Sequence, residues 1–243
     1  MSLNLILGDC LTELPKIEAK SIDLVLCDPP YNLTSLDWDK LIPFEEMWRQ
    51  IKRVRKDNCA SLIFGIEPFS SALRLSNIKE YKYDWFWQKE RPTNVLQVKR
   101  RPGKVIENIC VFYKQQPKYF PQKTAHGGDL RTNKIKNGQL GKLIDNQNKR
   151  AVAYRDDRTR YPLQLIKFNR DILTSNLHPT QKPVKLLEYF IKTYTQEGDT
   201  VLDFCSGVAS TGVACQNLNR NFIGIEIDPN YYRIACERLK NGV

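Results

Sequence analysis

One junction limits what this chain can fold into more than any other: the apolar, strand-length run Ile22–Cys27 ends in Asp28-Pro29-Pro30-Tyr31. Proline fixes its own φ and pushes the preceding residue into extended backbone, so the segment after the run is stiff. The proline carbonyls have no helix or ladder to join and can accept hydrogen bonds from a ligand. Asp28 adds a charged acceptor and Tyr31 a flat ring, which together suit a planar ring with an exocyclic amino group. The alternative is a rigid strand-to-helix turn with Asp28 as its cap.

Strand-length and helix-length segments alternate along most of the chain. Strands are expected over residues 3–7, 22–27, 59–64, 81–88, 105–113, 200–203 and 222–226. Helices are expected over residues 11–17, 44–55, 183–194, 211–218 and 229–239, with a short one from Pro68. The alternation predicts an α/β fold with a doubly wound, mostly parallel sheet of seven strands that binds ligands at the strands' carboxyl ends. Strands 81–88 and 105–113 are expected to form an antiparallel hairpin around a basic loop.

Positive charge is concentrated in the middle of the sequence. The 243 residues carry a formal net charge of +11, but residues 89–170 contain 20 Lys and Arg against 6 Asp and Glu. The rest of the chain is close to neutral, with 18 basic and 21 acidic residues. A localised excess of this size favours a nucleic-acid-binding face over a merely solvated surface. DNA contacts are predicted for eight residues of this region: Lys99, Arg100, Arg101, Lys104, Lys134, Lys136, Lys149 and Arg150.

Cysteine usage and hydropathy narrow the class of protein further. The seven cysteines are odd in number and scattered, no pair has C-x-x-C spacing, and there are only two histidines. A zinc or other metal site is therefore not expected, and free thiols fit a reducing cytosol. No leader-like or membrane-spanning apolar stretch is present, so a cytoplasmic protein without a membrane partner is expected.

A second ligand-binding element lies near the end of the chain. Residues 201–207 read as a strand that runs into a small-residue loop before a helix, which allows a ligand to approach backbone amides at the helix start. Nineteen residues after Gly207, Glu226 ends the next strand, where a carboxylate can accept both ribose hydroxyls. Asp228 precedes Pro229 and is expected to cap a helix instead. This layout suits adenosine-type cofactors and does not by itself separate NAD from S-adenosylmethionine, although no G-x-G-x-x-G is present.

Taken together, five segments resemble the motifs of the DNA methyltransferases that act on exocyclic amino groups. They are Gly8-Asp9-Cys10 (motif III), Asp28-Pro29-Pro30-Tyr31 (motif IV), His178-Pro179-Thr180-Gln181-Lys182-Pro183 (motif X), Asp203-Phe204-Cys205-Ser206-Gly207 (motif I) and Gly224-Ile225-Glu226 (motif II). The catalytic motif comes first and the cofactor loop last, which is the order of the β class. The resemblance implies a catalytic half at 1–114, a basic target-recognition insert at 115–176 and a cofactor-binding half at 177–243.

The resemblance also implies roles for individual residues. Catalysis is assigned to Asp28, Pro29, Pro30 and Tyr31, and cofactor binding to Asp9, Asp28, Lys182, Asp203, Phe204, Ser206, Gly207 and Glu226. S-adenosylmethionine would be the cofactor, with Asp9 on its adenine, Glu226 on its ribose, and Lys182 with the motif I loop on its methionine part. The substrate would be a base flipped out of double-stranded DNA. A homodimer, a restriction–modification system with a cognate endonuclease, and association with the nucleoid of a prokaryote or a phage-infected host remain open.

The sequence indicates the family more clearly than it indicates the target base or whether the site is catalytically active. An acid before Pro-Pro is commoner among the family's adenine enzymes and serine among its cytosine enzymes, so Asp28 favours N6-adenine over N4-cytosine methylation. Motif I departs from the family's usual Gly-Ser-Gly-Thr, because Val208 replaces the serine and Ala209 replaces the second glycine. A Cβ at a position that requires φ > 0 would narrow the cofactor loop. A catalytically impaired DNA-binding relative is therefore an alternative, as is an NAD oxidoreductase, which explains neither the Asp-Pro-Pro-Tyr segment nor the basic insert.

Overall fold

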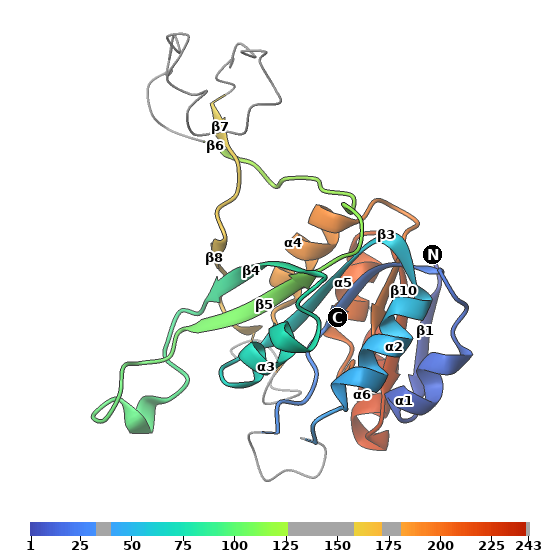
Figure 1. Ribbon diagram of the computed structural model, residues 1–243, viewed down its shortest axis with the longest axis horizontal. Helices are drawn as coiled ribbons and strands as arrows, with labels where there is room; N and C mark the ends of the chain where they lie inside the picture. Colours follow the sequence, from blue (N-terminus) through green and yellow to red (C-terminus); the bar gives the residue numbers. More distant parts are fainter. Residues whose placement is uncertain (33–39, 126–157, 172–180, 242–243) are drawn as a thin grey trace. The chain divides into compact units, whose positions relative to one another are not determined.

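The computed structural model describes residues 1–32, 40–125, 158–171 and 181–241, and its main body is an eight-stranded sheet between helices (Figure 1). The strand order is β1-β10-β9-β2-β3-β5-β4-β8. The strands of this sheet are β1 (Leu3–Leu7), β2 (Ile22–Cys27), β3 (Arg55–Gly65), β4 (Tyr81–Gln88), β5 (Ile106–Phe112), β8 (Leu165–Lys167), β9 (Thr200–Asp203) and β10 (Asn221–Glu226). All neighbouring pairs are parallel except the two that involve β5.

Helices cover both faces of this sheet, as the predicted doubly wound fold requires. They are α1 (Cys10–Glu13), α2 (Phe44–Val54), α3 (Phe69–Ser76), α4 (Val184–Tyr194), α5 (Ser210–Asn217) and α6 (Pro229–Asn241), with short 3-10 turns η1 (Leu14–Lys16) and η2 (Val95–Gln97). Side chains of β2 alternate between two hydrophobic clusters. Leu24 and Leu26 pack in the cluster that contains residues of α4, α5 and α6. Val25 and Cys27 pack in the cluster of α1, α2 and α3, so the strand is buried on both sides.

The predicted hairpin is confirmed, and one strand was missed. β4 and β5 are antiparallel, with Trp85 opposite Ile109, and both Trp85 and Trp87 are buried core residues. The sheet has eight strands instead of the predicted seven because β8 adds to the edge of β4, with Trp87 aligned to Ile166. This strand has only three residues, which is too short to show a period of two.

The chain divides into two compact units, and the smaller one comprises residues 121–162. Its described part contains β6 (Thr124–Ala125) and β7 (Thr159–Arg160), which pair antiparallel. Residues 163–171, with β8, belong to the larger unit together with 1–120 and 181–243. Among the described residues, no helix has the length and apolar character needed to cross a membrane. All seven cysteines are free thiols.

Candidate active site

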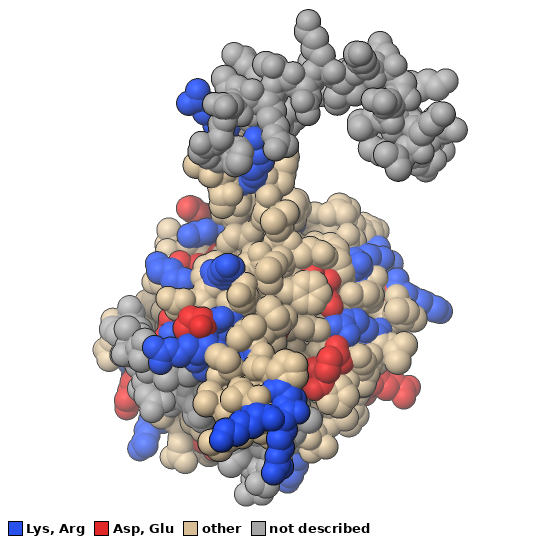
Figure 2. Space-filling model, turned by 90° about the vertical axis from the view of Figure 1, so that its left-hand side faces the viewer, with Lys and Arg blue, Asp and Glu red and all other residues tan. Residues whose placement is uncertain are grey.

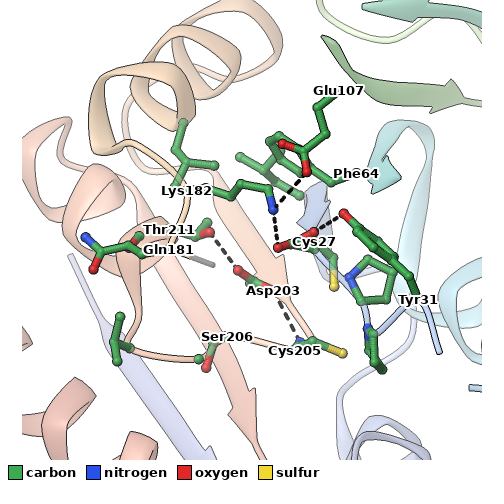
Figure 3. Close-up of a pocket in the computed structure, with 18 of the residues that line it drawn as sticks. Cys27, Tyr31, Phe64, Glu107, Gln181, Lys182, Asp203, Cys205, Ser206 and Thr211 are labelled. Carbon is green, nitrogen blue, oxygen red and sulfur yellow. Dashed lines mark hydrogen bonds and ion pairs between the residues drawn. The ribbon is translucent and has the colours of Figure 1, made fainter. Parts of the chain in front are cut away.

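The carboxyl ends of four parallel strands open into one cavity of about 930 Å³. The segments that follow β1, β2, β9 and β10 supply Asp9, Asp28, Ser206 and Glu226 to its lining. The cavity therefore brings together residues that the sequence placed at separate strand ends, from the first tenth of the chain to the last. Figure 3 shows part of this lining.

Asp28 and its neighbours form one side of the cavity, here called the proline side (Asp28, Tyr31, Glu107 and Lys182). The Lys182 ammonium donates to one carboxylate oxygen of Asp28, and the Tyr31 hydroxyl donates to the other. The Tyr31 ring leans on Phe69, with centroids 4.9 Å apart and planes at 39°. Two of the predicted catalytic groups are thus held in place by contacts outside their own segment.

Lys182 also faces a second carboxylate, that of Glu107. Its Nζ lies 3.5 Å from Glu107 Oε1 and 5.2 Å from the centroid of the Phe64 ring (Figure 3). The other oxygen of Glu107 lies 3.0 Å from Lys89 Nζ, so carboxylates and ammonium groups alternate from Asp28 to Lys89. Glu107 is 5 % exposed and Lys182 8 % exposed, so these charges are stabilised mainly by one another and little by water.

The pKa values on the proline side reflect burial and this alternation. Burial opposes the charged form of Lys182, but Asp28 and Glu107 outweigh it and raise the pKa of the ammonium. Burial likewise disfavours ionised Glu107, yet Lys182 and Lys89 lower the pKa of this carboxyl. Burial raises the pKa of Asp28, with Lys182 opposing the rise and Glu107 adding to it. Of the two carboxylates that face Lys182, Asp28 is therefore the one whose pKa is raised and Glu107 the one whose pKa is lowered.

Glu107 was not predicted as a site residue. It lies in the second position of β5, a strand whose other side chains are apolar except for that of Asn108. Because β5 is antiparallel to β3, with Gly65 aligned to Asn108, the start of β5 lies at the edge where the parallel strands end. An isolated acid in an apolar strand was a signal that it needs a buried partner.

The other side of the cavity is formed by the residues around the motif I loop and is called the glycine side (Asp203, Ser206, Gly207 and Glu226). Glu226 is 7 % exposed, and its two oxygens accept from the backbone N–H groups of Gly207 at 2.6 Å and Asp228 at 2.9 Å. Burial raises the pKa of Glu226, while these amides partly oppose the rise. Each oxygen keeps a second lone pair for a ligand.

Asp203 is fixed by local contacts of the same kind. Its carboxylate accepts from the Thr211 hydroxyl at 2.6 Å and from the Cys205 N–H at 3.2 Å (Figure 3). Burial raises the pKa of Asp203 to about 6. Phe204 is buried in the core beneath the loop and also lines the cavity.

Two further acids, Asp9 after β1 and Asp228 after β10, are both helix caps. Asp228 accepts from the N–H groups of Asn230 at 2.7 Å and Tyr231 at 3.1 Å, which confirms its predicted role at the start of α6. Asp9 caps α1 in the same way, since one oxygen accepts from Leu11 N–H at 2.8 Å. Asp9 also lines the cavity, whereas Asp228 does not.

The unusual loop residue Ala209 has the left-handed backbone that the sequence suggested, with φ 57° and ψ 40°. Its side chain is fully buried in the core cluster of α4 and α5 and is absent from the cavity lining. The methyl group therefore does not narrow the cavity. Gly207 has φ 53°, no atom lies within 4 Å of where its Cβ would be, and it lines the cavity.

The predicted DNA-contacting residues fall into three groups. Lys104 is half-buried and lines the cavity together with the basic residues Lys89 and Arg91. Lys99, Arg100 and Arg101 are exposed on the loop between β4 and β5, and they do not reach the cavity. Lys134, Lys136, Lys149 and Arg150 lie outside the described residues, as do His178, Pro179 and Thr180 of the motif X segment.

Two polar side chains in the lining have hydrogen-bonding atoms that no protein group satisfies. Gln181 is 8 % exposed with both amide atoms unpartnered, and the Ser206 hydroxyl is likewise unpartnered. Buried polar atoms of this kind normally have a partner, so a polar ligand belongs here. Together with the Glu226 carboxylate and the cavity volume, they fit a nucleoside cofactor with a polar amino-acid part. Gln181 lay within the motif X segment but was not predicted as a ligand.

Comparison with known families identifies the class. The family model described as DNA methylase matches residues 22–237, which is most of the chain. The chain belongs to this family, whose members methylate the N6 of adenine or the N4 of cytosine, and it is an S-adenosylmethionine-dependent DNA methyltransferase. The NAD oxidoreductase alternative is therefore wrong.

Individual relatives span nearly the whole chain. DNA adenine methyltransferase YhdJ of Escherichia coli (strain K12) is 29 % identical over 96 % of this chain and 81 % of its own length. The type II methyltransferase M2.DpnII of Streptococcus pneumoniae is 28 % identical over 97 % of this chain and 89 % of its own.

Solved structures share the fold at lower identity. The PvuII DNA methyltransferase (cytosine-N4-specific) superimposes with a TM-score of 0.69 at 17 % identity, covering 100 % of this chain and 94 % of its own. The M1.HpyAVI–SAM complex gives a TM-score of 0.64 at 24 % identity, covering 98 % of this chain and 100 % of its own. The predicted α/β class with its mostly parallel sheet is confirmed.

Proposed function

We propose that this enzyme methylates the N6 amino group of adenine in double-stranded DNA, with Asp28 as its principal catalytic residue. The observation that carries the proposal is the position of Asp28: its carboxylate lines the same cavity as Glu226 and the motif I loop. An acceptor of amino hydrogens therefore shares one cavity with a ribose-binding carboxylate. The acid before Pro-Pro favours adenine over cytosine, and the relative YhdJ is named as an adenine enzyme.

Asp28 and the residues around it have separate tasks in the proposed reaction. The lone pair of an aromatic amine is delocalised into the ring, so the nitrogen is a poor nucleophile. Asp28 and the carbonyl of Pro29 accept hydrogen bonds from the two amino hydrogens and favour a pyramidal nitrogen. Lys182 and the Tyr31 hydroxyl hold the Asp28 carboxylate in orientation, while the Tyr31 ring and Pro30 stack against the flipped base.

The residues of the glycine side hold the cofactor. S-adenosylmethionine supplies an electrophilic methyl group on a positively charged sulfur. Glu226 would accept the ribose hydroxyls with its remaining lone pairs, and Asp9 would accept a hydrogen bond from the adenine amino group. Ser206, Gly207 and Gln181 hold the polar atoms of the methionine part. As the amino nitrogen bonds to the methyl carbon, the bond from that carbon to sulfur would break and S-adenosylhomocysteine would leave as a neutral thioether. Asp28 would take the surplus proton of the nitrogen and pass it to water.

DNA is held by the basic residues around the cavity. Lys89, Arg91, Lys104 and Arg170 are part of the cavity lining, and Figure 2 shows Lys and Arg side chains on the face from which the β4–β5 hairpin projects. Phosphate neutralisation supplies most of the affinity for DNA, whereas only a few side chains read bases. Lys134, Lys136, Lys149 and Arg150 are proposed to extend this contact. The type II relatives support a restriction–modification role in the cytoplasm, where an endonuclease would recognise the same site.

The test is methyl transfer from radiolabelled S-adenosylmethionine to unmethylated plasmid DNA, followed by nucleoside analysis of the digested product. N6-methyladenine is the expected product. If the product is N4-methylcytosine, the proposed mechanism still holds but the proposed target base is wrong. No transfer by a folded enzyme that binds the cofactor would identify a catalytically impaired relative.

A further inference from the structure

The tip of the β4–β5 hairpin exposes apolar side chains where a soluble loop normally carries polar ones. Val95 is 63 % exposed, Leu96 99 % and Val98 47 %. Leu96 is the most exposed large apolar side chain among the described residues. Three such side chains within four residues form a small apolar point and are not single, scattered hydrophobic residues.

Hydrogen bonds hold this tip in a fixed shape. The Asn94 side chain donates to the Pro102 carbonyl at 3.0 Å and accepts from Lys104 N–H at 2.6 Å, which ties together the two arms of the loop. The turn η2 between them is closed by Gln97 N–H to Asn94 O at 2.8 Å. Because the backbone is already ordered, presenting Leu96 to a partner costs little conformational entropy.

The surroundings of the tip identify the partner as DNA. The next residues along the loop, Lys99, Arg100 and Arg101, are exposed and basic, which is the charge that phosphates attract. Val95 lines the same cavity as Asp28, whereas Leu96 does not. The apolar point therefore begins in the lining of the cavity proposed to receive the target base, at Val95, and is followed along the loop by the basic stretch. Figure 1 shows the hairpin projecting from the sheet.

We propose that Leu96 is a wedge: it inserts between base pairs of the duplex at the place that the target base leaves when it enters the cavity. This inference rests on the proposed function and adds to it. Extruding a base breaks stacking on both sides and leaves a gap in the duplex. An apolar side chain fills such a gap without needing hydrogen bonds, and DNA-binding proteins use Leu in this way to unstack base steps. Insertion removes the Leu96 side chain from water. This burial stabilises the complex with the flipped base and has no effect on the free enzyme.

The test compares Leu96→Ala, Leu96→Met and the control Leu75→Ala on one duplex that contains the methylated site, identified from the plasmid product. Leu75 is 74 % exposed on α3, so it matches Leu96 in type and exposure. Leu96→Ala should lower kcat/KM about tenfold, while Leu96→Met and Leu75→Ala should stay within about twofold of the wild type. These are exposed positions, so folding is unaffected. A Leu96→Ala enzyme within twofold of the wild type overturns the wedge.

A second duplex separates the wedge from an ordinary DNA contact. In it the target base lies opposite an abasic site, so that extrusion is easier. Leu96→Ala should recover at least half of its loss there, whereas Asp28→Ala should recover nothing. An equal loss of activity on both duplexes overturns the proposal. It is also overturned if light scattering shows that Leu96→Ala changes the enzyme from dimer to monomer, because the tip would then contact a second copy of the chain. If the wild type itself transfers no methyl group to DNA, the proposed function fails instead.

Salt dependence gives an independent readout. Leu96→Ala should leave the slope of log affinity against log salt concentration unchanged. Replacing Lys99, Arg100 and Arg101 together by Ala should flatten that slope by up to about three units, because three phosphate contacts are lost. A flattened slope in Leu96→Ala would mean that it only positions the basic residues, which contradicts the wedge.

Discussion

The two sides of the cavity hold their carboxylates in opposite ways. On the proline side, Asp28 and Glu107 share the ammonium of Lys182, and the three residues are far apart in the sequence. On the glycine side, one backbone amide and one hydroxyl from the same short stretch hold Asp203, and Glu226 is held by two backbone amides. The first arrangement depends on charges that must all be present, and the second on dipoles that belong to the backbone.

This difference suits the tasks proposed for the two sides. A carboxylate held by amides changes little when a ligand arrives, because the amides cannot move or lose a charge. A carboxylate held by an ammonium is oriented, but it remains sensitive to the loss of either partner. We therefore expect the proline side to respond to substitution mainly in turnover and stability, and the glycine side mainly in cofactor affinity.

The largest effect is expected from Asp28→Ala. It removes the acceptor of the amino hydrogens, so turnover should fall by about a hundredfold or more. Binding of S-adenosylhomocysteine, measured by calorimetry, should remain within about several-fold of the wild type, since the cofactor residues lie on the glycine side. An equal loss of turnover and cofactor binding would make Asp28 a structural residue and remove the distinction between the two sides.

The next largest effect concerns stability. Lys182→Met leaves the buried Glu107 and the partly exposed Asp28 without the ammonium that they share, which should lower the free energy of unfolding by about 3–5 kcal/mol. The control is Lys185→Met, whose side chain is 79 % exposed and should change stability by less than about 0.5 kcal/mol. Urea unfolding of both variants decides the point, and similar values for the two would show that the charge alternation is unimportant.

A pH-dependent effect is expected on the glycine side. Burial raises the pKa of Asp203 to about 6, from about 3.9 in an unfolded chain. The folded state then binds more protons between these pH values, so the stability that this group contributes is present below about pH 4 and lost as pH rises through about 6. Asp203→Asn does not titrate. Its free energy of unfolding relative to the wild type should therefore rise by about 1–3 kcal/mol from pH 4 to 7. A constant difference would contradict a raised pKa.

The smallest effects separate two acids that are only two residues apart. Glu226→Ala removes a charged acceptor worth about 1.5–3 kcal/mol, so the affinity for S-adenosylhomocysteine should fall about tenfold or more. Asp228→Ala should leave that affinity nearly unchanged and lower stability by about 1 kcal/mol through the lost cap of α6. Should Asp228 prove the stronger determinant of affinity, the ribose would lie at the start of α6 and not at the end of β10.

Much of the glycine side could be predicted because its contacts are local. Gly207, Glu226 and the cap at Asp228 each follow a strand that the hydrophobic pattern predicts, and the backbone partners lie within a few residues or on the next strand. Lys182 shows the limit of this reasoning. Its segment predicted a contact with the cofactor, whereas the structure directs its ammonium to Asp28 and Glu107.

The sequence by itself determined the alternation of strands and helices, the stiff acceptor segment at Asp28 and the separation of a basic region from a neutral scaffold. These follow from side-chain periodicity, proline geometry and charge, which are properties of short stretches. Only the tertiary structure decided that β5 runs against its neighbours and delivers Glu107 to the ligand edge, and that an apolar tip stands beside the cavity. Strand direction and loop placement depend on pairing between distant segments, and no short stretch of sequence carries that information.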